Sequence, residues 1–188
     1  KINKGANYPA FTSLPWGATA TVPEGTADAD ETVEIVCTVD TSVLPFVPSA
    51  TYDDANMKWY YVKNNNTYYL SHKSGQDHIA LNDAAKTIDE NNKDAFTWAF
   101  VGNPFDGFKL VNYGAGETKG VNSTGSGNPA LGDINTATVW QIKPSATNND
   151  NEHFCFQYPD SNQYMNAQGG KVAFWGSADQ GSTMWVTE

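Results

Sequence analysis

The 188-residue chain contains no arginine, only two cysteines and no apolar run long enough to span a bilayer. Without guanidinium groups, it lacks the usual bidentate clamp for phosphate and carboxylate ligands. Its 11 lysines stand against 21 acidic residues, and the resulting net charge of -10 repels nucleic acid and anionic lipid. We therefore expect no nucleic-acid partner and no membrane insertion, and the composition favours a neutral ligand.

The two cysteines, Cys37 and Cys155, are too few for a disulfide framework and match no zinc or redox motif. We expect both to be free thiols. Strand alternation places Cys37 on the same side as Val33, Ile35 and Val39, and it places Cys155 on the wetter face of its own strand. A bridge between the two cysteines is therefore disfavoured.

Motifs for catalysis or metal binding are missing as well. The sequence has no G-x-S-x-G elbow, H-E-x-x-H motif or Walker loop, and its three histidines have no partner pattern. The acidic residues 28–31 lack the glycine and the bidentate glutamate of a calcium loop. The first four residues lack the apolar core of a signal peptide, as in a processed chain. We predict a protein that is not an enzyme and has no cofactor or metal.

Short stretches rich in Val, Thr, Tyr, Trp and Phe alternate with turn residues, which predicts an all-β protein. Tryptophan recurs in similar settings at Trp98, Trp140 and Trp185, with spacings of 42 and 45 residues. Each of these tryptophans lies in the predicted fourth strand of a repeat, and three further predicted strands precede it in matching positions. Three four-stranded repeats are what a closed threefold architecture needs, so the sequence predicts a β-trefoil.

The predicted repeats cover residues 57–103, 106–145 and 152–188 within a trefoil domain at residues 51–188. Alternation places two sets of side chains in the core, in addition to the recurring tryptophans: Trp59, Phe108 and Phe154, and Tyr61, Leu110 and Phe156. Residues 1–50 stand outside the repeat as a short β segment or part of a small β module. In that segment residues 32–39 alternate as a strand, and residues 22–25 form a turn before it.

Residues 58–62, 98–109 and 172–175 resemble segments of ricin-type β-trefoil domains, and more closely of trefoil modules at the end of large secreted or surface proteins of gut bacteria. The segment at residues 5–46 is similar, more loosely, to the β segment that precedes such modules. The resemblance implies a lectin-like module, secreted or on the cell surface, within a longer protein. The Gln-x-Trp signature of the ricin type is replaced here by Phe96-x-Trp98, Thr138-x-Trp140 and Thr183-x-Trp185.

A sugar site needs an aromatic face for the C–H side of the ring and a few polar groups for its hydroxyls. In ricin-type domains these are an Asp after the first strand, an aromatic residue that ends the third, and polar residues before the fourth. In repeat three, the positions that match this pattern, together with one neighbouring candidate, are Asp160, Asn162, Trp175, Asp179, Gln180 and Ser182. The resemblance therefore implies a neutral-glycan site in a monomeric module.

Trp175 has no counterpart in the other repeats, where Asn82 and Gly132 stand at its position. Two alternatives remain open: Trp175 packs across the hairpin over Tyr164 or the N-terminal strands, and Asp160 is a turn residue that accepts backbone N–H groups. Two other functions also stay open. One is a structural or protein-interaction trefoil that has lost sugar binding, and the other is a trefoil of the protease-inhibitor type.

Overall fold

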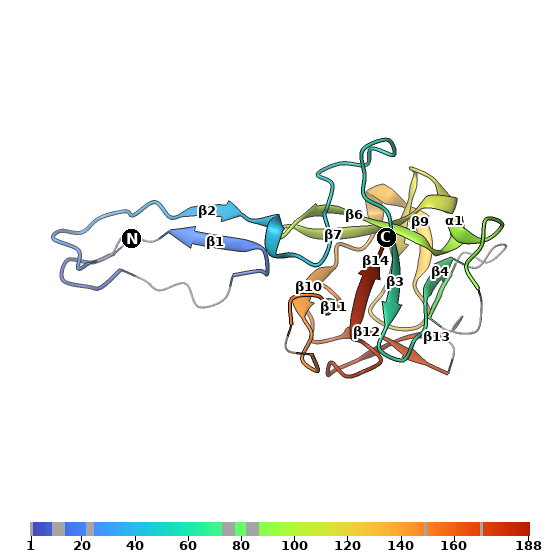
Figure 1. Ribbon diagram of the computed structural model, residues 1–188. Coiled ribbons are helices and arrows are strands. Elements are labelled where there is room, and N and C mark those ends of the chain that lie inside the picture. Colours follow the sequence, from blue (N-terminus) through green and yellow to red (C-terminus); the bar gives the residue numbers. More distant parts are fainter. Residues whose placement is uncertain are drawn as a thin grey trace.

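A narrow arm and a rounded body make up the molecule (Figure 1). The computed structural model describes residues 2–8, 14–21, 25–72, 78–81, 87–148, 150–169 and 171–188. Short strands dominate both parts. None of the helices in the described ranges has the length and apolar character that crossing a membrane requires.

The arm, at residues 2–40, is a two-stranded antiparallel ribbon of β1 (Ala18–Thr21) and β2 (Val36–Val39), followed by the 3-10 helix η1 (Thr41–Val43). Its outer end is closed by backbone bridges from Ile2 to Glu31 and from Asn7 to Thr26. The predicted strand at residues 32–39 is therefore shorter than expected, because residues 32–35 lie outside β2. Of the predicted turn at residues 22–25, residues 22–24 lie outside the described residues.

The described part of the body contains twelve strands in three groups of four. The first group contains β3 (Tyr60–Asn64), β4 (Leu70–His72), β5 (Ile79–Leu81), α1 (Lys93–Phe96) and β6 (Thr97–Asn103). The second contains β7 (Gly107–Asn112), η2 (Tyr113–Ala115), β8 (Lys119–Asn122), β9 (Ala130–Asp133), η3 (Ile134–Thr136) and β10 (Gln141–Pro144). The third contains β11 (Phe154–Gln157), β12 (Tyr164–Gln168), β13 (Lys171–Trp175) and β14 (Met184–Thr187).

The strands pair as a trefoil requires. The first and fourth strands of the groups form one curled sheet, in which β14 pairs with β3, β3 with β6, β6 with β7, and β10 with β11. The second and third strands form the hairpins β4–β5, β8–β9 and β12–β13, and the last of these stays joined to the sheet through β11. The predicted all-β, β-trefoil class is confirmed.

The threefold core corrects the predicted register of repeat one. Three equivalent pairs meet between first and fourth strands: Tyr60 with Trp98, Phe108 with Trp140, and Phe154 with Met184. The core positions of repeat one are therefore Tyr60 and Val62, and the prediction of Trp59 and Tyr61 is wrong by one residue. The aromatic run of residues 59–61 places rings on both faces of its strand, so alternation cannot fix the register.

The same pairing displaces the third predicted tryptophan. Trp98 and Trp140 are fully buried, but Met184 takes their place in repeat three. Trp185, predicted as core, lies one residue further on and is only half-buried. Its ring contacts the imidazole of His153 with centroids 5.4 Å apart, and the Nζ of Lys63 lies 5.6 Å from its centroid. Trp185 therefore belongs to the outer wall of the trefoil.

The segment before the first repeat contributes to the core. Phe46 stacks on Phe100 with ring centroids 3.7 Å apart and an interplanar angle of 7°, and Leu44 is buried beside it. Backbone hydrogen bonds join Ser49 to Phe100 and Gly102 over 2.9 and 2.8 Å. At the base of the arm, a Cβ on Gly17 would lie 3.1 Å from the Pro104 ring, so the arm touches the turn between β6 and β7 there. The domain division at residue 50 stays a prediction.

The two cysteines are free, as expected, but they differ in environment. Cys37 is exposed on β2, whereas Cys155 is fully buried on β11. The prediction that Cys155 faces the wetter side is wrong, because the turn before β14 covers that side and brings Ser182 and Thr183 within hydrogen-bonding reach. Burial raises the pKa of the Cys155 thiol, and these hydrogen bonds oppose the shift.

Candidate functional site

The hairpin β12–β13 exposes one face and buries the other. Met165 and Phe174 are paired and pack into the core, so alternation turns the paired residues Tyr164 and Trp175 outward. Trp175 is 39% exposed, and no other aromatic ring in the described part of the chain packs against it. In Figure 1, the strand β13 lies on the side of the trefoil away from the arm.

A row of side chains leads from Trp175 into the sheet. Trp175 pairs with Tyr164, and Tyr164 pairs with Gln157, which places all three side chains on the same face. The Gln157 Nε2 donates to the Ser161 carbonyl over 2.6 Å. Its buried Oε1 accepts no hydrogen bond from any described residue. Gln157 therefore holds an unused acceptor next to the aromatic pair.

Asp160 and Asn162 lie at the tip of the loop between β11 and β12, and both are exposed. The base of this loop is closed by the Tyr158 N–H donating to the Gln163 carbonyl over 2.8 Å. Asp160 has a φ of 52°, the left-handed region that suits Asp in a turn. Among the described residues, none donates a hydrogen bond to its carboxylate. The structure therefore does not contain the hydrogen bonds of the alternative in which the Asp160 carboxylate accepts from backbone N–H groups of its own turn.

Asp179 is held firmly in the turn before β14. Its Oδ1 accepts hydrogen bonds from Asn166 Nδ2 over 2.7 Å, from the Gly181 N–H over 2.8 Å and from the Ser182 N–H over 3.2 Å. Asn166 is two residues from Tyr164 on β12 and shares its outward face, so Asp179 lies alongside the hairpin. Its second oxygen has no hydrogen bond from a described residue.

The other two predicted residues of this turn differ from each other. Gln180 is exposed. Ser182 is fully buried, and its Oγ accepts from the Asp179 N–H over 2.8 Å and donates to the Asp179 carbonyl over 3.1 Å. Its hydroxyl is therefore used inside the turn and positions Asp179, and it does not face the surface.

A pocket of about 520 Å³ flanks β13 between repeats two and three. Its polar lining comes from amides, a hydroxyl and one ammonium group: Asn128, Gln163, Gln168, Ser126 and Lys171. None of the described residues that line it carries a carboxylate. Neutral donors and acceptors of this kind suit the hydroxyl groups of an uncharged polar ligand.

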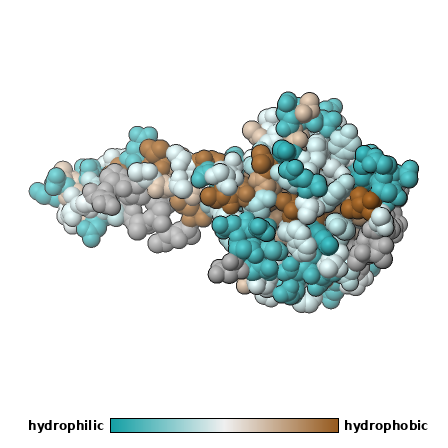
Figure 2. Space-filling model, viewed as in Figure 1, coloured by the Kyte–Doolittle hydropathy of each residue, from teal (hydrophilic) through white to brown (hydrophobic). Residues whose placement is uncertain are grey.

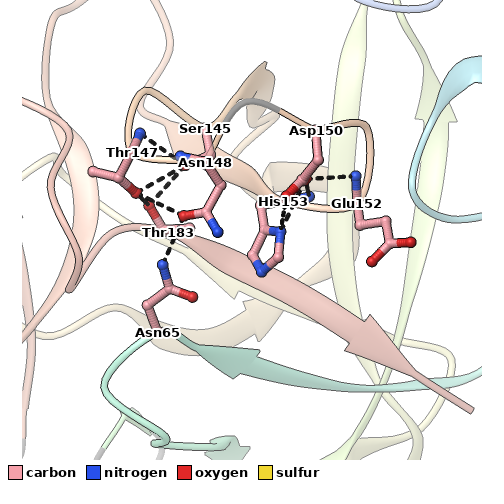
Figure 3. A network of polar contacts seen from close by, with 8 residues as sticks. All are labelled: Asn65, Ser145, Thr147, Asn148, Asp150, Glu152, His153 and Thr183. Atoms are coloured by element: carbon pink, nitrogen blue, oxygen red, sulfur yellow. Dashed lines mark hydrogen bonds and ion pairs between the residues drawn. The ribbon is translucent and has the colours of Figure 1, made fainter.

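A polar network beside Asp179 anchors the loop before β11 (Figure 3). The Thr183 hydroxyl lies 2.9 Å from the Ser145 hydroxyl and 2.7 Å from that of Thr147, and it donates to the Asp179 carbonyl. The His153 Nδ1 contacts the Asp150 carboxylate at 2.8 Å, which lowers the pKa of Asp150. The hydroxyls bond to one another and not to the imidazole, so this network is a structural clamp and not a nucleophile with its base.

The corresponding positions in the other repeats lack the aromatic residue. A Cβ on Gly132 would lie 2.4 Å from the side-chain Nδ2 of Asn122, so a larger residue there would displace that amide. Asn82 and Asp83 of repeat one lie outside the described residues. Sequence reasoning missed Gln157 and Gln163, and it named Tyr164 only as a packing partner of Trp175. Strand pairing links Gln157 and Tyr164 to Trp175, and Gln163 lines the pocket beside β13.

No protein-family model matches the chain, and none of the curated proteins matches it in sequence. Several solved structures match it in fold. SeviL bound to asialo-GM1 saccharide is 12% identical with a TM-score of 0.54, and the match covers 71% of this chain and 98% of that one. A ricin B-like lectin from Macrolepiota procera in complex with lactose is 14% identical with a TM-score of 0.54, covering 74% and 96%.

A third neighbour is an enzyme. A GlcNAcα1-4Gal-releasing endo-β-galactosidase from Clostridium perfringens is 15% identical with a TM-score of 0.54, and the match covers 68% of this chain but only 31% of the enzyme. At these identities the three likenesses show the fold alone. This chain has the fold of ricin B-like lectins.

Proposed function

We propose that this chain is a non-catalytic carbohydrate-binding module, and that its glycan rests on the outward face of the hairpin β12–β13. The observation that carries the proposal is Trp175, a large aromatic ring that is 39% exposed on the hairpin β12–β13. A sugar ring stacks on such a face through its C–H groups, while fixed polar groups orient its hydroxyls.

The polar groups of the site have distinct roles. The carboxylates of Asp160 and Asp179 accept hydrogen bonds from sugar hydroxyls, and Asn162 and Gln180 donate from the rim. Asp179 is oriented in advance by its three donors, so binding costs little additional ordering. Ser182 acts by holding that turn.

The lectin neighbours support a glycan as the ligand, since two of them were solved with a saccharide or lactose bound. The amide-rich pocket beside β13 and the absence of arginine support a neutral one. A single open site of this kind binds with a Kd on the order of millimolar to tens of micromolar, and it depends on multivalency for strength. The module accordingly belongs, as a monomeric unit, to a longer secreted or cell-surface protein of a gut bacterium.

One feature favours a second function, in which the chain is a structural or protein-interaction module. Exposed valines line the arm and its junction with the trefoil, including Val36 and Val47. Figure 2 shows this apolar surface beside a mostly hydrophilic trefoil face. A module of this kind would contact neighbouring protein domains through the arm, and Trp175 would bind no ligand.

A glycan array printed at high density tests the proposal with the wild type, Trp175→Ala and Phe105→Ala. Phe105 is a matched control because it is an exposed aromatic residue at the turn between β6 and β7, away from the hairpin. We expect Trp175→Ala to lose about tenfold or more in affinity, roughly 1.4 kcal/mol, with unchanged thermal unfolding. A wild type that retains no glycan would contradict the proposal, as would a Trp175→Ala variant that binds normally.

A further inference from the structure

Three aromatic rings form a cluster on the trefoil surface that the threefold core does not use. Trp59 contacts Tyr52 edge to face with centroids 6.3 Å apart, and it contacts Tyr113 in the same way at 5.1 Å. We call these three rings the aromatic ridge. Contacts of this geometry hold rings in fixed orientations. Tyr113 remains 43% exposed, so the ridge is rigid and open to solvent.

A surface pocket lies on each side of the ridge. One, of about 440 Å³, is lined by Trp59 and Tyr113, by two residues of α1 and by the first residue of β6. The other, of about 480 Å³, is lined by Tyr52 and by residues around β8 and η3. Because both tyrosines contact Trp59, the ridge forms a shared wall between the two pockets. Each volume lies within the range of small-ligand sites.

The ridge contains a hydrogen-bond donor without an acceptor. The indole Nε1 of Trp59 is buried and finds no partner among the described residues. A desolvated N–H group costs free energy until an acceptor reaches it. The ring that carries the N–H group also lines a pocket, so a ligand hydroxyl oxygen that reaches this atom would supply the missing acceptor.

The rim of the second pocket offers both hydrogen-bond acceptors and donors, and one of its carboxylates is held in place. Asn135 donates to one carboxylate oxygen of Asp133 over 2.8 Å from its backbone and 3.0 Å from its side chain. Glu117 lies near the Tyr52 phenol, where its charge adds to the effect of burial in raising the pKa of Tyr52. Lys119 completes the rim. Acidic and basic groups stand together, so the rim does not select one sign of charge.

The rim of the first pocket is similarly mixed. Lys93 is paired with Glu90, and Asp94 stands next to it. An aromatic face flanked by paired charges and hydroxyl acceptors has the chemistry of a sugar-binding surface and not of an anion site. An unpaired acidic cage would instead have pointed to a cation.

We propose that the aromatic ridge is a second binding surface, which takes an extended neutral oligosaccharide with one sugar on Tyr113 and further sugars in the pockets on either side. The inference rests on the proposed carbohydrate-binding function and adds a site built by residues 52–59 and repeats one and two. Since the ligand must bridge two pockets, its affinity rises with chain length, whereas a single ring suffices at Trp175.

The test is a titration with cello-, xylo- and galacto-oligosaccharides of two to six residues, followed by NMR of the tryptophan indole N–H signals. In the wild type, we expect the Trp59 signal to shift with the longer oligosaccharides. Tyr113→Ala should weaken this binding about tenfold, an effect of the size seen when a stacking aromatic residue is lost. Trp59→Phe, which keeps an aromatic ring and removes the donor, should weaken it several-fold, and Phe105→Ala should leave it unchanged.

The outcomes separate this inference from the proposed function. If Trp175→Ala abolishes all binding and Tyr113→Ala changes none, the ridge is not a site and the Trp175 site stands. If Tyr113→Ala weakens binding and Trp175→Ala does not, the ridge stands and the Trp175 site fails. A ridge that responds to tetramethylammonium chloride and to no oligosaccharide is a cation site, which overturns the inference.

Discussion

The arm and the trefoil are both built from short antiparallel strands, yet they keep their structure in different ways. In the arm, all four side chains of β2 are exposed, and the ribbon is held by backbone pairing. In the trefoil, strands of similar length bury a continuous cluster that includes Trp98, Trp140, Phe154 and Phe156. Two strands alone cannot enclose a core, whereas twelve strands that close on themselves can.

This difference separates the residues that stabilise the fold from the residues that are free to bind a ligand. The trefoil concentrates its aromatic residues in the core and leaves a few, such as Trp175 and Tyr113, open to a ligand. The segment that follows the arm contributes Phe46 and Leu44 to that core, whereas the side chains of the arm strand β2 face solvent. Two predictions test how independent the two regions are, and a third tests an ion pair within the trefoil.

The largest expected effect concerns the two thiols, since each region contains one. Cys37 is exposed and should react with a thiol reagent at the rate of a free cysteine. Cys155 is buried and its thiol pKa is raised, so it should react only when the trefoil opens. A global stability of about 5 kcal/mol or more slows that reaction at least about a thousandfold. Mass spectrometry of the labelled chain measures both rates, and in denaturant the difference should vanish.

Equal rates at the two cysteines in native buffer would mean that the trefoil has no more cooperative stability than the arm. A slow reaction at both would mean that the arm is covered in solution, which favours the interaction function.

The next effect concerns Phe46→Ala compared with Val39→Ala. Phe46 stacks on Phe100 inside the trefoil, so its loss should cost about 3–5 kcal/mol of unfolding free energy. Val39 is exposed on β2, and its loss should change stability by less than about 0.5 kcal/mol. Urea unfolding followed by tryptophan fluorescence measures both. A small loss for Phe46→Ala would place the segment before residue 50 outside the trefoil core.

The smallest expected effect is on the pH dependence of stability, through Asp150. Its pKa is lowered by the hydrogen bond from His153, so its contribution to stability is present above the unfolded-state value of about 3.9 and is lost as the pH falls through the folded value. Asp150→Asn should therefore melt at a slightly lower temperature than the wild type near neutral pH. At a pH below the folded pKa of Asp150 the two melting temperatures should converge. A difference that persists unchanged in acid would show that the carboxylate charge is not what matters.

Much of the fold could be predicted from the spacing of Trp98 and Trp140, because a repeat fixes the number of strands and hence the closed architecture. The register could not be predicted fully. The aromatic run Trp59-Tyr60-Tyr61 is compatible with either register, because both place an aromatic residue in the core. Nothing in the sequence distinguishes Met184 from its neighbour Trp185 as the core residue. Only the pairing between first and fourth strands decides which residue points inward.

The candidate site shows the same limit. Trp175 stands out in the sequence because the other repeats have no aromatic residue there, and the structure exposes it. Gln157 and Tyr164 join it through cross-strand neighbours, and the aromatic ridge unites residues 52, 59 and 113 through the folded chain. Non-local contacts of this kind are set by tertiary pairing, which local patterns do not encode.

The central claim is that a glycan contacts the face of Trp175. Titration of ¹⁵N-labelled protein with the strongest array glycan, followed through the indole N–H signal of Trp175 and the backbone signals of Asp160, Asp179 and Gln180, tests it most directly. The account predicts saturable shifts at these residues, with the arm signals of Thr19 and Thr38 unmoved. Shifts confined to the arm, or no shift at Trp175 at saturating glycan, would contradict it.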